Sequence, residues 1–250
     1  PTVHDAAPRE GFALLSDLGR DSYLDVLDEG NADRLIEDAL KALVRWQAAT
    51  REGGLPPYDE GVLREELALF PDWYVERHLE RCLDAAQREA WERLCNTLVR
   101  DALVQPQVFV HRDYILRNLM VSDPNPGVID FQDARVGPLA YDLVSLFRDA
   151  FYSFGEAKID AWRRRYLELA RGVSLPVPEH DADFVAMFDR TGLQRHLKVV
   201  GIFSRLAYRD KKRQYLDEIP RFLGYLRVIA PRYPDTAELV GLLDALEEPR

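Results

Sequence analysis

Apolar residues recur every three or four positions over most of the chain, which is the spacing of an amphipathic helix. In residues 31–50, for example, Leu35, Ala39, Leu43 and Trp46 follow this spacing. The same pattern predicts helices in several further segments: residues 62–79, 85–103, 139–151, 157–171, 181–209, 217–230 and 235–247. Helices therefore make up most of the expected fold.

The pattern changes after residue 104, where short runs of β-branched and aromatic residues replace the helical spacing. The runs are residues 108–110, 119–121 and 127–131, and their length and composition are typical of strands. The segment SDPNPG between the last two runs is rich in turn-forming residues and predicts a β-hairpin. With a further strand expected at residues 12–15, the fold class is α+β, a helical body that holds a small β-hairpin insert.

Composition and charge narrow the class of protein. Of the 250 residues, 47% are hydrophobic and 30% are charged, as in globular proteins with a sizeable core. The formal net charge of −10 attracts neither nucleic acid nor an anionic membrane surface, and no segment has the roughly 18 continuous apolar residues of a membrane span. Because Cys82 and Cys95 are the only cysteines, we expect reduced thiols in a cytoplasmic protein without nucleic-acid or membrane partners.

Polar residues gather in the β-rich region, each next to strand-like apolar sequence: His111, Asp113, Asn118, Asp130 and Asp133. A buried carboxylate without a partner is costly, and the acids here outnumber the neighbouring arginines. A divalent metal ion satisfies several hard oxygen ligands at once. The alternative is that these residues only cap turns at the ends of strands.

The order of these residues indicates phosphoryl transfer. That chemistry needs a carboxylate to orient and deprotonate a hydroxyl, and oxygen ligands for the Mg²⁺ bound to nucleotide phosphates. The pattern H-x-D, then N, then I-D-F in a later loop matches the arrangement in protein-kinase-like enzymes. Asp113 would be the catalytic base, while Asn118 and Asp130 would hold Mg²⁺ and ATP. Asp133 is either a second metal ligand or a turn cap.

Three further residues are expected to act near this loop. Arg117 either contacts phosphate during catalysis or pairs with an acid, and the sequence leaves both open. We expect His111 to hold the loop through its ring nitrogens rather than to carry protons. Asp142, at the start of a predicted helix, is expected to brace the loop.

The segments HRDYILRN and GVIDFQDARVGPLAYDLVSLFRD resemble the aminoglycoside phosphotransferase and choline kinase-like family. The resemblance implies a protein-kinase-like fold, ATP and Mg²⁺ as cofactors, and a small-molecule substrate. Protein kinases keep a lysine two residues after the catalytic base, and Ile115 occupies that position here. We therefore expect no protein substrate.

A narrower resemblance is carried by SLFRDAF and QRHLKVVGIFSRLAYRD, which are similar to the amino-sugar kinases of bacterial cell-wall recycling. It implies phosphorylation of the anomeric hydroxyl of N-acetylmuramate or N-acetylglucosamine, so that the partner would be a small amino sugar and the product a sugar 1-phosphate. Two alternatives stay open: an antibiotic kinase acting on aminoglycosides, and a catalytically dead regulator that binds nucleotide or sugar.

The resemblance also implies a division of the chain. Family members hold ATP between a β-rich N-lobe and a helical C-lobe. Residues 1–20, which include GFALLSDLG, resemble the last N-lobe strand and the hinge, with Ser16 and Leu18 near adenine. Residues 21–250 would form the helical C-lobe with the catalytic and metal-binding loops. The glycine-rich loop and phosphate-binding lysine of the N-lobe have no counterpart here, so we expect the N-lobe to be largely absent from this chain.

Candidate sugar contacts lie on two predicted helices. Glu66 and Trp73 recur at helical spacing and would share one face, which suits an aromatic platform beside a carboxylate. An amphipathic helix with an acid at its edge explains them equally well. The long helix of residues 181–209 carries Arg195 and Arg205, of which Arg205 could pair with a substrate carboxylate such as a lactyl group. It could equally pair with a helix-boundary acid such as Asp149.

Overall fold

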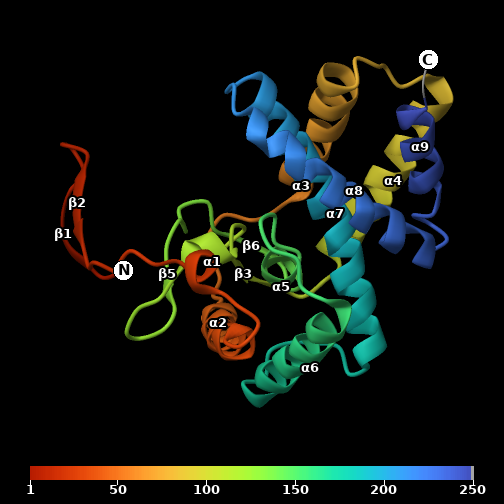
Figure 1. Ribbon diagram of the computed structural model, residues 1–250. Helices are drawn as coiled ribbons and strands as arrows, with labels where there is room; N and C mark the ends of the chain where they lie inside the picture. Colours follow the sequence, from red (N-terminus) through yellow and green to blue (C-terminus); the bar gives the residue numbers. More distant parts are fainter. Residues whose placement is uncertain (249–250) are drawn as a thin grey trace.

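A computed structural model of the protein describes residues 1–248, and most of these residues form helices (Figure 1). The α-helices are α1 Tyr23–Val26, α2 Ala32–Ala48, α3 Glu60–Leu69, α4 Ala85–Leu103, α5 Tyr141–Phe147, α6 Glu156–Gly172, α7 Asp181–Tyr208, α8 Ile219–Ile229 and α9 Glu238–Glu247. A π-helix and three 3₁₀ helices connect them: η1 Phe70–His78, η2 Leu116–Asn118, η3 Arg213–Glu218 and η4 Ala230–Arg232.

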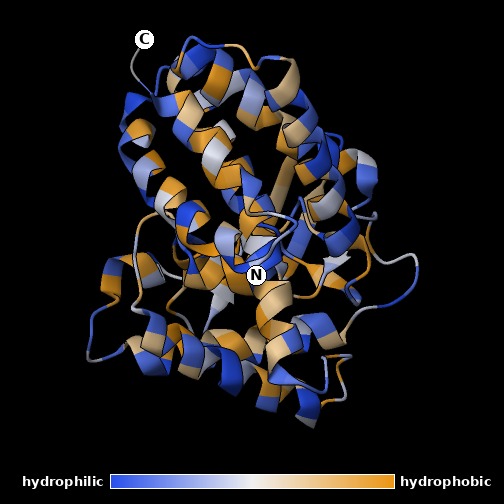
Figure 2. Ribbon diagram, turned by 90° about the vertical axis from the view of Figure 1, so that its right-hand side faces the viewer, coloured by the Kyte–Doolittle hydropathy of each residue, from blue (hydrophilic) through white to orange (hydrophobic). Residues whose placement is uncertain are grey.

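Helix α7 is the centre of the helical body. It contacts α3, α4, α5, α8 and η1, and Figure 1 shows it running through the middle of the molecule. Hydrophobic and hydrophilic residues alternate along the helices (Figure 2), so that each helix buries its apolar side against its neighbours. The expected helical body is therefore confirmed. Within residues 1–248, no helix is both long and apolar enough to cross a membrane.

The strands form three separate two-stranded sheets. Strands β4 (Leu119–Met120) and β5 (Gly127–Val128) pair antiparallel across the predicted turn. Strand β3 (Gln107–Val110) pairs antiparallel with β6 (Arg135–Pro138). We did not predict β6, because the glycine and proline of RVGP are typical of turns. The polar loop of residues 111–118 thus connects two small sheets and precedes the β4–β5 hairpin.

The N-terminal segment is a hairpin of β1 (Val3–Ala7) and β2 (Phe12–Leu15). Only the second strand was predicted, since VHDAA carries too few β-branched or aromatic residues to indicate a strand. In Figure 1 this hairpin lies at one edge of the molecule, away from the helices. Its large side chains are mostly exposed.

The predicted single helix over residues 62–79 is wrong in one respect. Helix α3 ends at Leu69 and continues as the π-helix η1, whose wider turns shift the side chains that follow. At this junction α7 approaches closely: a Cβ added to Gly201 would lie 2.4 Å from the backbone of Leu69. Only glycine permits that approach. Glu66 and Trp73 therefore lie on helices of different periodicity.

Candidate active site

The loop of residues 111–118 follows β3 and ends in η2. It turns tightly, since the Ile115 N–H donates to the Asp113 carbonyl at 2.9 Å and the Asn118 N–H donates to the Ile115 carbonyl at 2.9 Å. Arg112 has a φ of 74°, a left-handed conformation that is costly for a residue with a Cβ. Such a conformation persists only where surrounding contacts hold it.

Two buried carboxylates provide those contacts. Asp142, on α5, accepts the backbone N–H groups of His111 at 2.7 Å and Arg112 at 3.0 Å. Asp149, just after α5, accepts the N–H of Leu116 at 3.0 Å. Burial raises the pKa of Asp142 to about 7, although its backbone donors act in the opposite direction. Both acids therefore fix the loop through its backbone, and Asp149 is a support that the sequence did not indicate.

The ring of His111 connects the loop to the β4–β5 hairpin. Its Nε2 lies 3.0 Å from the Ile129 carbonyl, and burial lowers its pKa. The neutral ring therefore carries its proton on Nε2 and donates it to this carbonyl. Ile129 directly precedes Asp130, so this bond sets the position of Asp130 relative to the loop.

Asn118, at the end of the loop, lies beside Asp130. The amide Nδ2 of Asn118 donates to the Asp113 carbonyl at 2.9 Å and to the Asp130 carboxylate at 3.4 Å. Asp130 has a φ of 67°, and its other oxygen accepts Gln132 Nε2 at 2.8 Å. Because Nδ2 makes both donor contacts, the amide oxygen of Asn118 is left for a cation. This set of hard oxygens fits a divalent ion such as Mg²⁺.

Asp133 differs from these two residues. Its side chain is exposed, and within residues 1–248 only its backbone carbonyl has a hydrogen-bond partner, Arg112 Nη1 at 3.4 Å. In the described part of the chain, no three His, Cys, Asp or Glu side chains are grouped so as to hold a metal ion. A metal at Asn118 and Asp130 would therefore need further oxygens from a ligand or water.

A cavity of about 220 Å³ lies beside the β4–β5 hairpin and is lined by Ser16, Leu18, Met120 and Ile129. The Thr2 N–H donates to Ser16 Oγ at 2.7 Å. Since Ile129 precedes Asp130, this cavity adjoins the residues that could hold a metal. Its lining combines apolar residues with the polar Ser16 and Asp17, a combination that is typical of sites for small ligands.

A second cavity, of about 160 Å³, is lined by Asp113 and its loop neighbours Arg112, Ile115 and Arg117. Its cationic lining residues are Arg112, Arg117, Arg195 and Lys198, and its apolar walls include Phe151 and Phe203. The Arg117 guanidinium lies over the Phe151 ring, 3.9 Å from its centre. Cations thus outnumber the single lining carboxylate, although the chain as a whole is acidic.

Glu66 lies behind this second cavity and is only 6% exposed. Lys198 Nζ is 2.8 Å from its carboxylate, which also bonds Arg112, Tyr58 and Gln194. Burial acts to raise the pKa of Glu66, but the Lys198 ammonium and the Arg112 guanidinium together hold it below its usual range. Glu66 is therefore a buried counter-ion that two cations of the cavity wall share.

The other predicted sugar contacts lie elsewhere. Trp73 is partly buried in η1, and neither Trp73 nor Arg205 lines the cavity beside Asp113. Arg205 Nε is buried without a hydrogen-bond partner among the described residues. Sequence reasoning also missed Lys198. The sequence feature that could have indicated it is a lysine in the otherwise apolar segment KVVGIF of a long helix. A lysine in such a segment is expected to be buried, and a buried cation needs an anionic partner.

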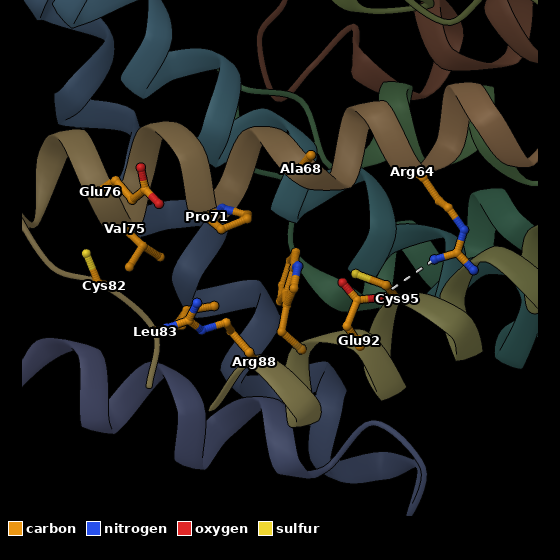
Figure 3. Close-up of a pocket in the computed structure, with 11 residues that line it drawn as sticks. Arg64, Ala68, Pro71, Val75, Glu76, Cys82, Leu83, Arg88, Glu92 and Cys95 are labelled. Atoms are coloured by element: carbon orange, nitrogen blue, oxygen red, sulfur yellow. Dashed lines mark ion pairs between the residues drawn. The ribbon is translucent and has the colours of Figure 1, made fainter. Parts of the chain in front are cut away.

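A larger cavity, of about 530 Å³, lies between α3–η1 and α4, and none of the predicted site residues lines it (Figure 3). Arg64 on its rim pairs with Glu60 at 2.7 Å and with Glu92 at 3.9 Å. The groups suited to phosphoryl transfer are instead collected around Asp113.

Comparison with known proteins places the chain among phosphotransferases. The profile of the "Phosphotransferase enzyme family" matches residues 1–184. The N-acetylmuramate/N-acetylglucosamine kinase of Pseudomonas aeruginosa is 53% identical over 238 residues, which cover 95% of this chain and 70% of that protein. The protein of the same name from Neisseria meningitidis serogroup B is 47% identical over 247 residues, covering 97% and 74%.

Solved structures of related shape are more distant in sequence. Choline kinase from Cryptosporidium parvum has a TM-score of 0.55 at 14% identity, covering 94% of this chain and 72% of that chain. An ADP-bound aminoglycoside phosphotransferase has a TM-score of 0.53 at 17% identity, covering 85% and 70%. At these identities the likeness concerns the fold alone. It confirms the protein-kinase-like fold expected from the sequence.

Proposed function

The chain belongs to the phosphotransferase enzyme family, and from this we propose that it is an ATP-dependent kinase of amino sugars. Its substrates are N-acetylmuramate and N-acetylglucosamine, which are phosphorylated on the anomeric hydroxyl to give the sugar 1-phosphate. The high identity to two kinases named for these sugars supports the substrate class. The reaction belongs to cell-wall recycling and would take place in the cytoplasm, where ATP is available.

Asp113 is the proposed catalytic base. It orients the anomeric hydroxyl and takes its proton as the oxygen–phosphorus bond forms and the bond to the ADP leaving group breaks. The observation that carries this role is its position: Asp113 lines the cavity beside the loop, while its own carbonyl is bonded to Asn118. Asn118 and Asp130 would hold Mg²⁺, which when bound neutralises charge on the phosphates.

The remaining residues serve these groups. Ser16 and Leu18 contact the adenine of ATP in the cavity beside the hairpin. His111 and Asp142 keep the loop in its strained conformation, and Arg117, next to Asn118 in sequence, contacts the transferred phosphate. Asp133 would contact the metal ion indirectly, through a bound water molecule.

Assignments on the acceptor side follow the lining of the cavity. Glu66 acts through Arg112 and Lys198 rather than by touching the sugar. Trp73 and Arg205 do not line the cavity beside Asp113, and we therefore expect neither to contact the reacting sugar.

The charge of the cavity beside Asp113 favours this substrate over an aminoglycoside. Aminoglycosides are polycations, and a wall that carries four basic side chains and one carboxylate repels them. An acidic or neutral sugar has no such penalty. The presence of Asp113, Asn118 and Asp130 together also argues against a regulator that only binds.

The test is ³¹P NMR of the complete gene product with ATP, Mg²⁺ and either amino sugar, with kanamycin in parallel. We expect a sugar 1-phosphate resonance coupled to the anomeric proton. ATP consumption with kanamycin but with neither sugar would make the protein an antibiotic kinase. ATP left intact with all three acceptors would support the binding regulator.

A further inference from the structure

Arg195 is a buried cation of the cavity beside Asp113 that forms no ion pair within the described residues. It lies on α7, is 5% exposed, and lines the cavity together with Asp113. Its Nη1 is buried and has no hydrogen-bond partner among the described residues. A buried, unpaired guanidinium donor is costly to a folded protein, so its presence in a cavity indicates a ligand that pairs with it.

The other cations of the cavity each have a partner, although the Nε of Arg112 is buried without one among the described residues. Arg112 and Lys198 are paired with the buried Glu66 carboxylate, and Lys198 also donates to the Tyr141 hydroxyl at 2.9 Å. Arg117 lies on the Phe151 ring and is exposed to solvent. Arg195 therefore differs from Arg112 and Lys198 in having no ion-pair partner among the described residues, and from Arg117 in being buried.

The acids nearest to Arg195 do not take up its donors. The positive charge of Arg195 acts to lower the pKa of both Asp142 and Asp149, although burial raises the pKa of each. The oxygens of Asp142, however, accept the backbone N–H groups of His111 and Arg112, and those of Asp149 accept Leu116 and Phe151. These carboxylates offset the charge of Arg195 without forming an ion pair with it.

The two proposed substrates differ in a group that suits this donor. N-acetylmuramate carries a lactyl ether with a carboxylate, which N-acetylglucosamine lacks. A guanidinium binds a carboxylate through two parallel hydrogen bonds. We propose that Arg195 is a specificity-determining residue that binds the lactyl carboxylate of N-acetylmuramate, whereas N-acetylglucosamine binds without it. This inference rests on the proposed function and assigns to Arg195 the contact that the sequence suggested for Arg205.

The test compares both sugars in the complete gene product carrying Arg195→Met or Arg195→Lys. For Arg195→Met we expect KM for N-acetylmuramate to rise about 10- to 100-fold, the loss expected for one or two charged hydrogen bonds. Arg195→Lys keeps the charge and should lose less. KM for N-acetylglucosamine and kcat for both sugars should stay within about 3-fold, because no transition-state contact is removed.

Matched variants separate this role from a structural one. Arg209→Met removes an exposed arginine at the end of α7 that pairs only with Asp210, and should leave both KM values unchanged. An equal loss with both sugars in Arg195→Met would mean that Arg195 only positions Asp142 and Asp149. A loss confined to N-acetylmuramate in Arg205→Met, and absent from Arg195→Met, would return the contact to Arg205.

A substrate-side measurement does not depend on how the variants fold. The methyl ester of N-acetylmuramate has a neutral lactyl group, so the wild-type enzyme should show the same rise in KM with the ester as Arg195→Met shows with the acid. Equal KM values of the wild type for acid and ester would overturn the inference while leaving the kinase activity established. If the wild type phosphorylates neither sugar, the proposed function fails and this inference fails with it.

Discussion

The cavity beside Asp113 and the larger cavity between α3–η1 and α4 differ in how their charged groups are satisfied. In the larger one, Arg64 is paired with Glu60, Glu92 and Asn96, so the charge of this arginine is satisfied without a ligand. In the smaller one, Arg195 keeps a buried donor without a partner. The volumes, about 530 and 160 Å³, would rank them in the opposite order. Unmet hydrogen-bonding capacity, rather than size, distinguishes the candidate site.

The largest expected effect concerns the base in the smaller cavity. Asp113→Asn should lower kcat about 10²- to 10⁴-fold, the contribution typical of a general base, because the amide cannot take the proton of the hydroxyl. Steady-state kinetics would measure the loss, and calorimetric titration with the sugar should show nearly unchanged affinity. If the variant kept its turnover, Asp113 would not be the catalytic base, and the cavity beside it would lose its main claim to be the active site.

The next effect concerns the counter-ion behind the cavity. Glu66→Gln leaves Arg112 and Lys198 without a buried anion, which should lower the free energy of unfolding by about 3–5 kcal/mol. Urea denaturation would measure it. Glu65→Gln is the matched control, because Glu65 is the exposed neighbour on the same helix. Similar losses in both variants would contradict the buried ion pairs.

Asp142→Asn should lower the free energy of unfolding by about 1–3 kcal/mol, since an amide cannot accept both backbone N–H groups. It should also change the pH dependence of stability. Because burial raises the pKa of Asp142 from 3.8 to about 7, the native wild type binds more protons than the unfolded chain between these values. Its stability advantage over the variant is therefore greatest near pH 4 and falls as pH rises toward 7. Urea denaturation across this pH range would measure it, and an advantage that grows with pH would contradict the raised pKa.

The smallest effect is expected in the larger cavity. Arg64→Ala removes only half-exposed ion pairs, so it should lower the free energy of unfolding by about 0–1 kcal/mol and leave kcat and KM for both sugars unchanged. Thermal unfolding and kinetics would measure both quantities. A tenfold loss of turnover would show that the larger cavity takes part in the function.

The sequence alone predicted the helical segments and the polar residues of the loop and its neighbour: His111, Asp113, Asn118 and Asp130. The helical segments are confirmed, because helical periodicity is a local property of the sequence. The roles of the four polar residues stay predictions. The predictions that rested on regular geometry over longer stretches did worse. The face shared by Glu66 and Trp73 assumed one continuous α-helix, and the π-helix that begins at Phe70 breaks it.

Only the tertiary structure shows which charged side chains form ion pairs and which have no partner. Glu66 meets Lys198 and Arg112, although these residues are far apart in sequence. The close approach of α7 to α3, seen at Gly201 and Leu69, brings Lys198 to Glu66, and the loop after β3 adds Arg112. Arg195, on α7, is buried and lines one cavity with Asp113. Burial and long-range ion pairing depend on the packing of the whole chain. The local sequence therefore determines which catalytic side chains are present, while the fold determines which of the charged side chains stay unpaired and can bind a ligand.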